Sequence, residues 1–117
     1  MFFQVDKDSV VAVYEQINFA VKAAIASGRV SSGEQLPSIR EVAAQLDVNP
    51  NTVAKAFRDL ETQGYVFTRR GMGVFVANDI RERCQQECMD RVATVVSVAK
   101  HMCLLAGINW NDLSSSA

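Results

Sequence analysis

The chain has 117 residues, 49% of them hydrophobic and 21% charged, which is the composition of an ordinary soluble globular protein. This length allows one compact domain, or a small domain with an appendage, and excludes two large domains. No apolar run approaches the ~20 residues that cross a bilayer, and no signal peptide is recognisable, so we expect a cytoplasmic protein without membrane association. Three cysteines without a secretory signal favour reduced thiols over a disulfide framework.

The charge balance does not by itself indicate a particular partner, because the formal net charge is -1. Residues 1–78 carry eight basic and eight acidic residues, and residues 79–117 carry four basic and five acidic residues. A local cluster of cations can bind phosphates even in a neutral protein. The positions of the basic residues therefore matter more than their sum.

The first predicted element is a helix that follows a short apolar arm, Phe2 to Val5, and is capped by Asp8 or Ser9. Gly28 suits the left-handed end of this helix. The apolar residues recur at spacings of three and four: Val10, Tyr14, Ile17, Val21, Ala24 and Ile25. This periodicity predicts a core-building helix, and the Gly and Pro of residues 29–37 predict a connector after it.

A second helix is predicted to begin at Ser38, where Glu41 completes a Ser-x-x-Glu capping box. Arg40 lies next to the helix N-terminus, where free amides and the backbone dipole already favour an anion such as a phosphate. The apolar side of this helix consists of Ile39, Val42, Ala43 and Leu46. We therefore expect one face to pack and Arg40 to be presented to a ligand.

A third helix is predicted after a three-residue turn, with Asn49 as its N-cap and Pro50 at its first position. Its packing face consists of Val53, Ala56, Phe57, Leu60 and Gly64. Its other face presents Asn51, Thr52, Lys55 and Arg58. Two helices so close in sequence predict a helix-turn-helix unit whose second helix enters the major groove of DNA.

A β-hairpin is predicted next, because residues 65–68 and 74–76 are aromatic and β-branched and bracket a glycine-containing turn. Arg69 and Arg70 lie at its tip, within reach of phosphates or the minor groove, and Gly71 and Gly73 allow a tight turn. Residues 1–77 thus predict a winged helix-turn-helix domain. The fold class is mainly α with a small β-hairpin.

Residues 78–117 predict a short helical dimerisation region. A helix is expected from Asn78–Asp79 to Gly107, followed by a short turn capped by Asn109 and a disordered tail from Ser114. Its apolar stripe consists of Val92, Val95, Val96, Ala99, Met102, Cys103 and Ala106. A small domain leaves such a stripe uncovered, so we expect a second copy of the chain to bury it.

Six motifs in this order resemble the GntR superfamily of bacterial transcription regulators, and the short C-terminal part resembles its YtrA subfamily. They are Tyr14-Glu15-Gln16-Ile17, Ser27-Gly28, Leu36-Pro37-Ser38-Ile39-Arg40-Glu41, Asn49-Pro50-Asn51-Thr52-Val53, Leu60-Glu61 and Gly71-Met72-Gly73-Val74-Phe75-Val76. The resemblance implies a homodimeric repressor of a two-fold-related operator on double-stranded DNA. A small-molecule effector would bind at the dimer interface or against the winged domain.

The resemblance also implies roles for single residues. Arg40 and Thr52 would contact DNA, and Gly71 and Gly73 would shape the wing. Many relatives have arginine at the positions of Pro50 and Ala54, so roles tied to those arginines do not transfer. The predicted DNA-facing set is therefore Ser38, Arg40, Asn49, Asn51, Thr52, Lys55, Arg58, Arg69, Arg70, Gly71 and Gly73.

The same residues allow three other interpretations. The basic residues are a solvated surface if Lys55 pairs with Asp59 and Arg58 with Glu61. The winged helix serves as a protein-interaction module if it does not bind DNA. A metal- or redox-sensing role would use Cys84, Cys88, His101 and Cys103. The pair Cys84 and Cys88 lies about four turns from the pair His101 and Cys103 on one helix, so the four residues close no single site; we predict no metal, no cofactor and no catalysis.

Overall fold

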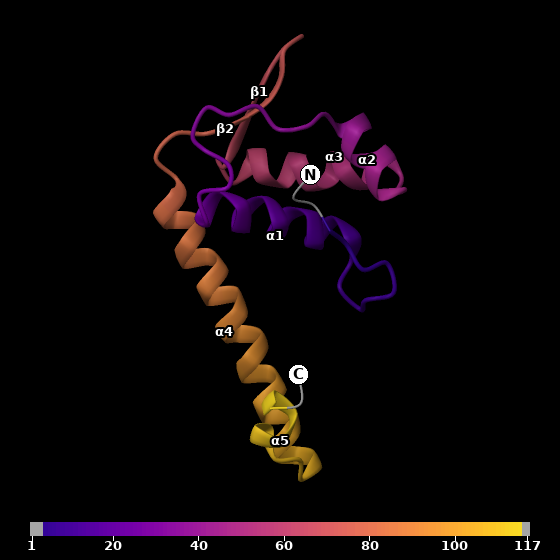
Figure 1. Ribbon diagram of the computed structural model, residues 1–117, viewed down its shortest axis with the longest axis vertical. Helices are drawn as coiled ribbons and strands as arrows, with labels where there is room; N and C mark the ends of the chain where they lie inside the picture. Colours follow the sequence, from indigo (N-terminus) through magenta and orange to yellow (C-terminus); the bar gives the residue numbers. More distant parts are fainter. Residues whose placement is uncertain (1–3, 116–117) are drawn as a thin grey trace. The chain divides into compact units, whose positions relative to one another are not determined.

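The computed structural model describes residues 4–115, with side chains described as far as Leu113. Phe2 and Phe3 of the predicted arm, and Ser116 and Ala117 of the predicted tail, lie outside these residues. The elements are α1 (Val13–Ala26), α2 (Ile39–Leu46), α3 (Pro50–Thr62), β1 (Val66–Arg69), β2 (Gly73–Val76), α4 (Arg81–Ala106) and α5 (Trp110–Ser115) (Figure 1). The predicted fold class, mainly helical with one hairpin, is confirmed. Within residues 4–115 no helix combines the length and apolarity needed to span a bilayer.

The chain divides into two compact units, which we call the head (Met1–Gln85) and the tail (Gln86–Ala117). The predicted division lies eight residues earlier, after Ala77. The difference arises because Ile80 and Cys84 belong to the hydrophobic core of the head, where Cys84 is fully buried. The first turn of α4 is therefore part of the head.

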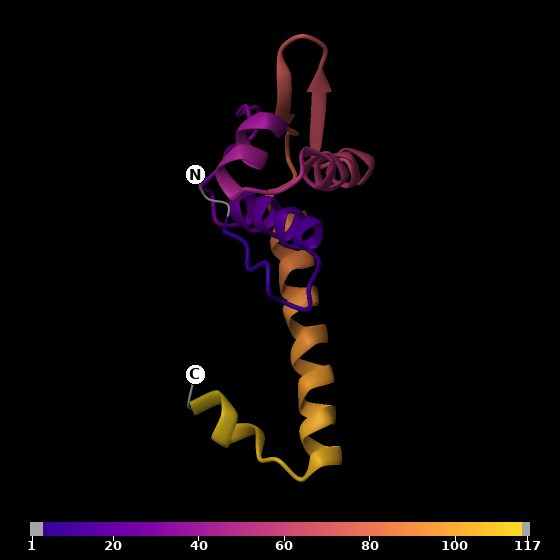
Figure 2. The same ribbon diagram turned by 90° about the vertical axis from the view of Figure 1, so that its right-hand side faces the viewer.

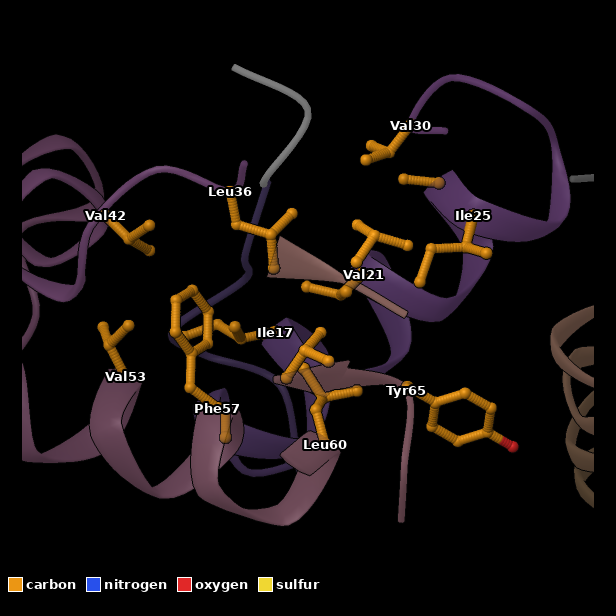
Figure 3. Packing of buried hydrophobic residues seen from close by; sticks show 14 of the residues in the cluster. Ile17, Val21, Ile25, Val30, Leu36, Val42, Val53, Phe57, Leu60 and Tyr65 are labelled. Atoms are coloured by element: carbon orange, nitrogen blue, oxygen red, sulfur yellow. The ribbon is translucent and has the colours of Figure 1, made fainter. Parts of the chain in front are cut away.

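Helix α3 is the centre of the head, since it packs against α1 and α2 and also contacts β1. Figure 3 shows Val53, Phe57 and Leu60 of α3 among the buried side chains of the neighbouring elements. The predicted packing residues Val53, Ala56, Phe57 and Leu60 are all buried, whereas Gly64 is exposed. The 3.6-residue period of α3 thus fixes which of its faces is left for a ligand.

The start of α1 differs from the prediction. The helix begins at Val13, and its N-cap, Ala12, offers no side-chain hydrogen bond. Ser9 Oγ accepts a hydrogen bond from the Val11 amide and Asp6 Oδ1 accepts one from Asp8, so these polar residues build local turns instead of a helix cap. Val10, predicted on the apolar face, lies outside the helix and is exposed.

The caps of the helix-turn-helix unit form as predicted. Ser38 Oγ accepts the Glu41 amide at 3.1 Å, and Glu41 Oε1 accepts the Ser38 amide at 3.2 Å. Asn49 Oδ1 accepts the Asn51 amide at 2.8 Å, and Pro50 occupies the first helical position. Between the two helices Asp47 adopts a left-handed conformation with φ of 53°, which ends α2.

The hairpin pairs β1 with β2 antiparallel, in a register that sets Val66 against Val76 and Arg69 against Gly73. β1 lies one residue later than predicted at both ends, and β2 begins one residue earlier than predicted. In Figure 2 the connecting turn projects away from α1, α2 and α3. The connector also pairs with the far side of β2, through Gly33 N–H to Val76 O and Leu36 N–H to Val74 O, both at 2.8 Å.

The helix predicted from Asn78–Asp79 begins at Arg81, because Asp79 has a φ of 57° that cannot continue a helix. Its predicted end is confirmed, since α4 closes at Ala106 and Gly107 has a φ of 70°. Asn109 caps α5 as expected, and its Oδ1 accepts the Asn111 amide at 3.0 Å.

Candidate nucleic-acid interface

The first turn of α3 presents the short polar residues predicted to read bases. The Asn51 side chain is exposed and Thr52 is half-buried. One turn further on, the Lys55 ammonium lies over the ring of Tyr14 from α1, 3.8 Å from its centroid. A cation so close to a ring face is attracted by the ring quadrupole, so Tyr14 restrains Lys55. Arg58, on the next turn, is exposed.

Helix α2 contributes Arg40, the second residue of that helix, whose side chain is exposed. The capping box already satisfies the amides of Ser38 and Glu41, so Arg40 projects from a helix end that is held in place. Ser38 Oγ and Asn49 Oδ1 each accept an amide within their own helix start. Their contact with DNA remains a prediction, and their demonstrated contacts are with the backbone.

The hairpin turn presents the remaining cations. The Arg69 guanidinium lies 5.2 Å from the centroid of the Phe67 ring, and Arg70 is exposed. Gly71 and Gly73 have φ values of 76° and 125°, in a region that side chains with a Cβ rarely adopt. The predicted reason for glycine at these two positions, a turn that needs positive φ, matches the observed backbone.

The electrostatic environment leaves these cations uncompensated. The ion pair between Lys7 and Asp47, with 3.6 Å between Nζ and Oδ2, involves none of the DNA-facing residues. The alternative in which Lys55 pairs with Asp59 is not observed in the described residues, where the Lys55 ammonium lies over the Tyr14 ring. The alternative pairing of Arg58 with Glu61 is also absent from the described residues, and Glu61 Oε2 accepts the Thr68 amide at 2.9 Å.

Three residues that support this surface were not singled out from the sequence for that role. Tyr14 restrains Lys55, Glu61 joins the end of α3 to β1, and Gln35 donates from its side-chain amide to the carbonyl oxygen of Met72 at 2.7 Å. Gln35 lies 37 residues from Met72 in the chain. No local pattern predicts such a contact, whereas Tyr14 and Glu61 lay within the motifs that indicated the family.

The tail carries the predicted apolar stripe. Val92, Val95 and Met102 are more than half exposed, Val96 and Ala99 are half-buried, and Ala106 is exposed. Cys103 differs from the rest, because it is already buried within one chain. Further exposed apolar residues that the predicted set omitted are Met89, Val98, Leu104, Leu105, Ile108 and Leu113.

The cysteines lie in different environments. Cys84 is buried in the head, whereas Cys88 is half-buried and Cys103 is buried in the tail, and none of the three forms a disulfide. His101 is exposed. Across residues 4–115 no three histidine, cysteine or carboxylate side chains gather closely enough to hold a metal ion.

Comparison with known proteins identifies relatives of this chain. Residues 13–76 match the family of bacterial regulatory proteins called the gntR family. The HTH-type transcriptional repressor YtrA of Bacillus subtilis is 38% identical over 78 residues, which are 67% of this chain and 60% of YtrA. The HTH-type regulator YhcF of the same organism is 32% identical over 84 residues and 69% of its length is covered.

Solved structures with the same fold include YtrA from Sulfolobus acidocaldarius, a GntR-family transcription factor, with a TM-score of 0.65 and 30% identity over 85% of this chain and 99% of that one. A GntR family regulator from Listeria monocytogenes has a TM-score of 0.68 and 28% identity, over 92% and 94% of the two chains. The resemblance to GntR proteins of the YtrA type is confirmed by these matches. The chain belongs to the GntR family of bacterial regulatory proteins.

Proposed function

We propose that this protein is a sequence-specific DNA-binding regulator that represses transcription. The observation that carries the proposal is the set of uncompensated cations on the exposed side of α2, α3 and the hairpin. Within residues 4–115, the side chains of Arg40, Arg58 and Arg70 form neither an ion pair nor a hydrogen bond. Free guanidinium groups on one winged helix-turn-helix unit are suited to phosphate oxygens and to the base edges of guanine.

The length and charge of the side chains indicate which residues would contact bases and which would contact phosphates. Asn51 and Thr52 open α3 and are short enough to reach base edges when the helix N-terminus enters the major groove. Arg40, Arg58, Arg69 and Arg70 would neutralise phosphates or enter the minor groove, which supplies affinity and orientation. The AraR DNA-binding domain is solved in complex with operator ORE1, and its similarity to this chain, 27% identity and a TM-score of 0.56 over 63% of this chain and 90% of that one, supports DNA binding by analogy.

Dimerisation through the tail would place two heads on a palindromic operator. The stripe residues Val92, Val95, Ala99, Met102 and Ala106, of which all but half-buried Ala99 are exposed, recur at intervals of three and four, as in a helix seam. A two-fold dimer presents its two recognition helices one helical turn of DNA apart, or a multiple of that distance. Repression then follows from occupancy of the operator, and a small-molecule effector would tune it by favouring one placement of the heads.

The test of DNA binding is the affinity for duplex DNA as a function of salt. Each phosphate contact that is lost should flatten the slope by about 0.9 log units of affinity per tenfold change in salt. Arg40→Ala should remove about one contact. Arg29→Ala is the matched control, because Arg29 is exposed but lies outside the DNA-facing set. If the wild-type protein does not bind duplex DNA at low salt, the protein-interaction module becomes the better interpretation.

The test of dimerisation is light scattering at micromolar concentration. Val95→Glu adds a charge within the stripe and should shift the mass from dimer to monomer. Ser97→Glu, on the other side of the same helix turn, is the control and should leave the dimer intact. A monomeric wild-type protein would remove this explanation of the exposed stripe.

A further inference from the structure

We propose that Gln35 positions the wing for binding, as a brace between the connector and the hairpin turn. The inference rests on the proposed DNA-binding function. The Gln35 side-chain amide donates to the Met72 carbonyl oxygen at 2.7 Å, and its backbone forms a β-bridge with Phe75. The brace therefore joins a fixed backbone position on one side of β2 to the turn that carries Arg70.

The turn needs such a brace because its own backbone restrains it little. Gly71 and Gly73 both have positive φ, and glycine gives the chain wide conformational freedom. The turn is closed by the ladder pair of Arg69 with Gly73 and by the hydrogen bond from Met72 N–H to Arg69 O at 2.9 Å. A two-stranded hairpin by itself is at best marginally stable in water. An added bond to the Met72 carbonyl reduces the number of orientations available to the tip.

The backbone of the connector makes this brace rigid. Leu36 N–H donates to Val74 O at 2.8 Å, and Val76 N–H donates to Glu34 O at 2.9 Å, so the residues on both sides of Gln35 are paired with β2. The backbone of Gln35 is thus held in a fixed, strand-like segment. Only the Gln35 side chain must become ordered for its amide to donate to the Met72 carbonyl oxygen.

Gly73 provides an independent sign that the amide occupies a defined place. A Cβ built on Gly73 would lie 2.5 Å from Gln35 Nε2, closer than real Cβ contacts allow. The missing side chain therefore leaves the space through which the Gln35 amide reaches Met72. Glycine at position 73 serves the brace as well as the turn.

The consequence for DNA binding is that the wing arginines are ordered before DNA arrives. An ordered tip loses less conformational freedom on binding, so affinity rises through preorganisation without a new contact. Loss of one net hydrogen bond should lower the population of the braced tip, and with it the affinity contributed by the wing, roughly fivefold. Gln35 is in this sense a positioning residue, which acts through Arg69 and Arg70.

A double-mutant cycle tests this role on a mixed-sequence duplex of ~30 base pairs, about three helical turns, at low salt. Gln35→Ala should weaken binding roughly fivefold in the wild-type chain and less than about twofold in the Arg69→Ala, Arg70→Ala background. Gln63→Ala, which removes an exposed glutamine side chain elsewhere in the head, is the control. An equal loss in both backgrounds, or a loss no larger than that of the control, would overturn the proposal.

Amide hydrogen exchange tests the brace without DNA. In the free Gln35→Ala protein the Met72 amide should exchange roughly fivefold faster, whereas the Val76 and Ala77 amides, which donate to Glu34 O and Tyr65 O, should keep their wild-type rates. Unchanged exchange at Met72 overturns the brace itself. Accelerated exchange combined with a wild-type protein that does not bind duplex DNA would instead support the brace and refute the DNA-binding function on which its role depends.

Discussion

The capping box of α2 permits a quantitative prediction for Ser38→Ala. The substitution removes the acceptor of the 3.1 Å hydrogen bond from the Glu41 amide and leaves that amide without its partner. Loss of a serine N-cap lowers the free energy of unfolding by about 1 kcal/mol. For a unit the size of the head, ending at Gln85, this corresponds to a decrease of about 4–8 °C in melting temperature. The helix affected has eight residues and carries Arg40, so a large fraction of its length depends on this turn.

Urea denaturation followed by circular dichroism measures the effect, at one protein concentration because an oligomer would make stability concentration-dependent. Ser38→Asp keeps an N-cap acceptor and should retain most of the stability. Ser32→Ala is the matched control, because Ser32 is exposed and its side chain forms no hydrogen bond in the described part of the chain. If Ser38→Ala and Ser32→Ala have the same midpoint, or if Ser38→Asp destabilises as much as Ser38→Ala, the capping argument is refuted.

Three further predictions concern the core, the hairpin and the thiols. Leu60→Ala should lower the free energy of unfolding of the head by about 2–5 kcal/mol, because Leu60 is fully buried, while Leu105→Ala at a 75% exposed position should leave it unchanged. Equal effects of the two substitutions in urea denaturation would contradict the burial of Leu60. Glu61→Ala should lower the free energy of unfolding by about 1–2 kcal/mol, because the Thr68 amide loses its acceptor. Glu61→Gln keeps an acceptor oxygen and should lower it clearly less, and the same urea titration measures both variants. A thiol reagent should modify half-buried Cys88 first in the native protein, and the two buried cysteines only on unfolding; simultaneous reaction of all three, followed by absorbance, would refute this order.

Those parts of the fold that depend on neighbours in sequence were predictable. The box of Ser38 and Glu41, the cap of Asn49 and the position of Pro50 each involve residues within one helical turn, so residue type and spacing are sufficient. The faces of α3 followed from its period. The wing was predictable because β-branched and aromatic residues flank two glycines. The turn between the strands requires the positive φ of these glycines, which is a local property.

The features that were missed depend on residues far apart in the chain. The predicted start of α1 was wrong because the Gln16 side chain binds the segment before the helix. It accepts from the Asp6 amide at 2.7 Å and donates to the carbonyl oxygens of Asp6 and Val11 at 2.8 Å. These bonds satisfy polar backbone groups that a continued helix would otherwise have paired. Similarly, Arg83 donates to the carbonyl oxygen of Gln63 at 2.7 Å, which ties the first turns of α4 to the end of α3 and moves the observed boundary of the head beyond residue 77.

The cations of the DNA-facing set fall into two groups, and the difference bears on how the proposed regulator would divide affinity from specificity. Lys55 and Arg69 lie over aromatic rings, whereas Arg40, Arg58 and Arg70 have no ring contact among the described residues. A ring contact at an exposed site is worth about 0.5–1 kcal/mol, and DNA must replace it before these two cations bind elsewhere. The same contact orders a long side chain that has ~2 kcal/mol of rotamer entropy to lose, so the two effects oppose each other. The free arginines face no such exchange and should dominate the salt-dependent affinity. Lys55, fixed over Tyr14 one turn after Thr52, is therefore better suited to influence which sequence is bound than how tightly DNA is held.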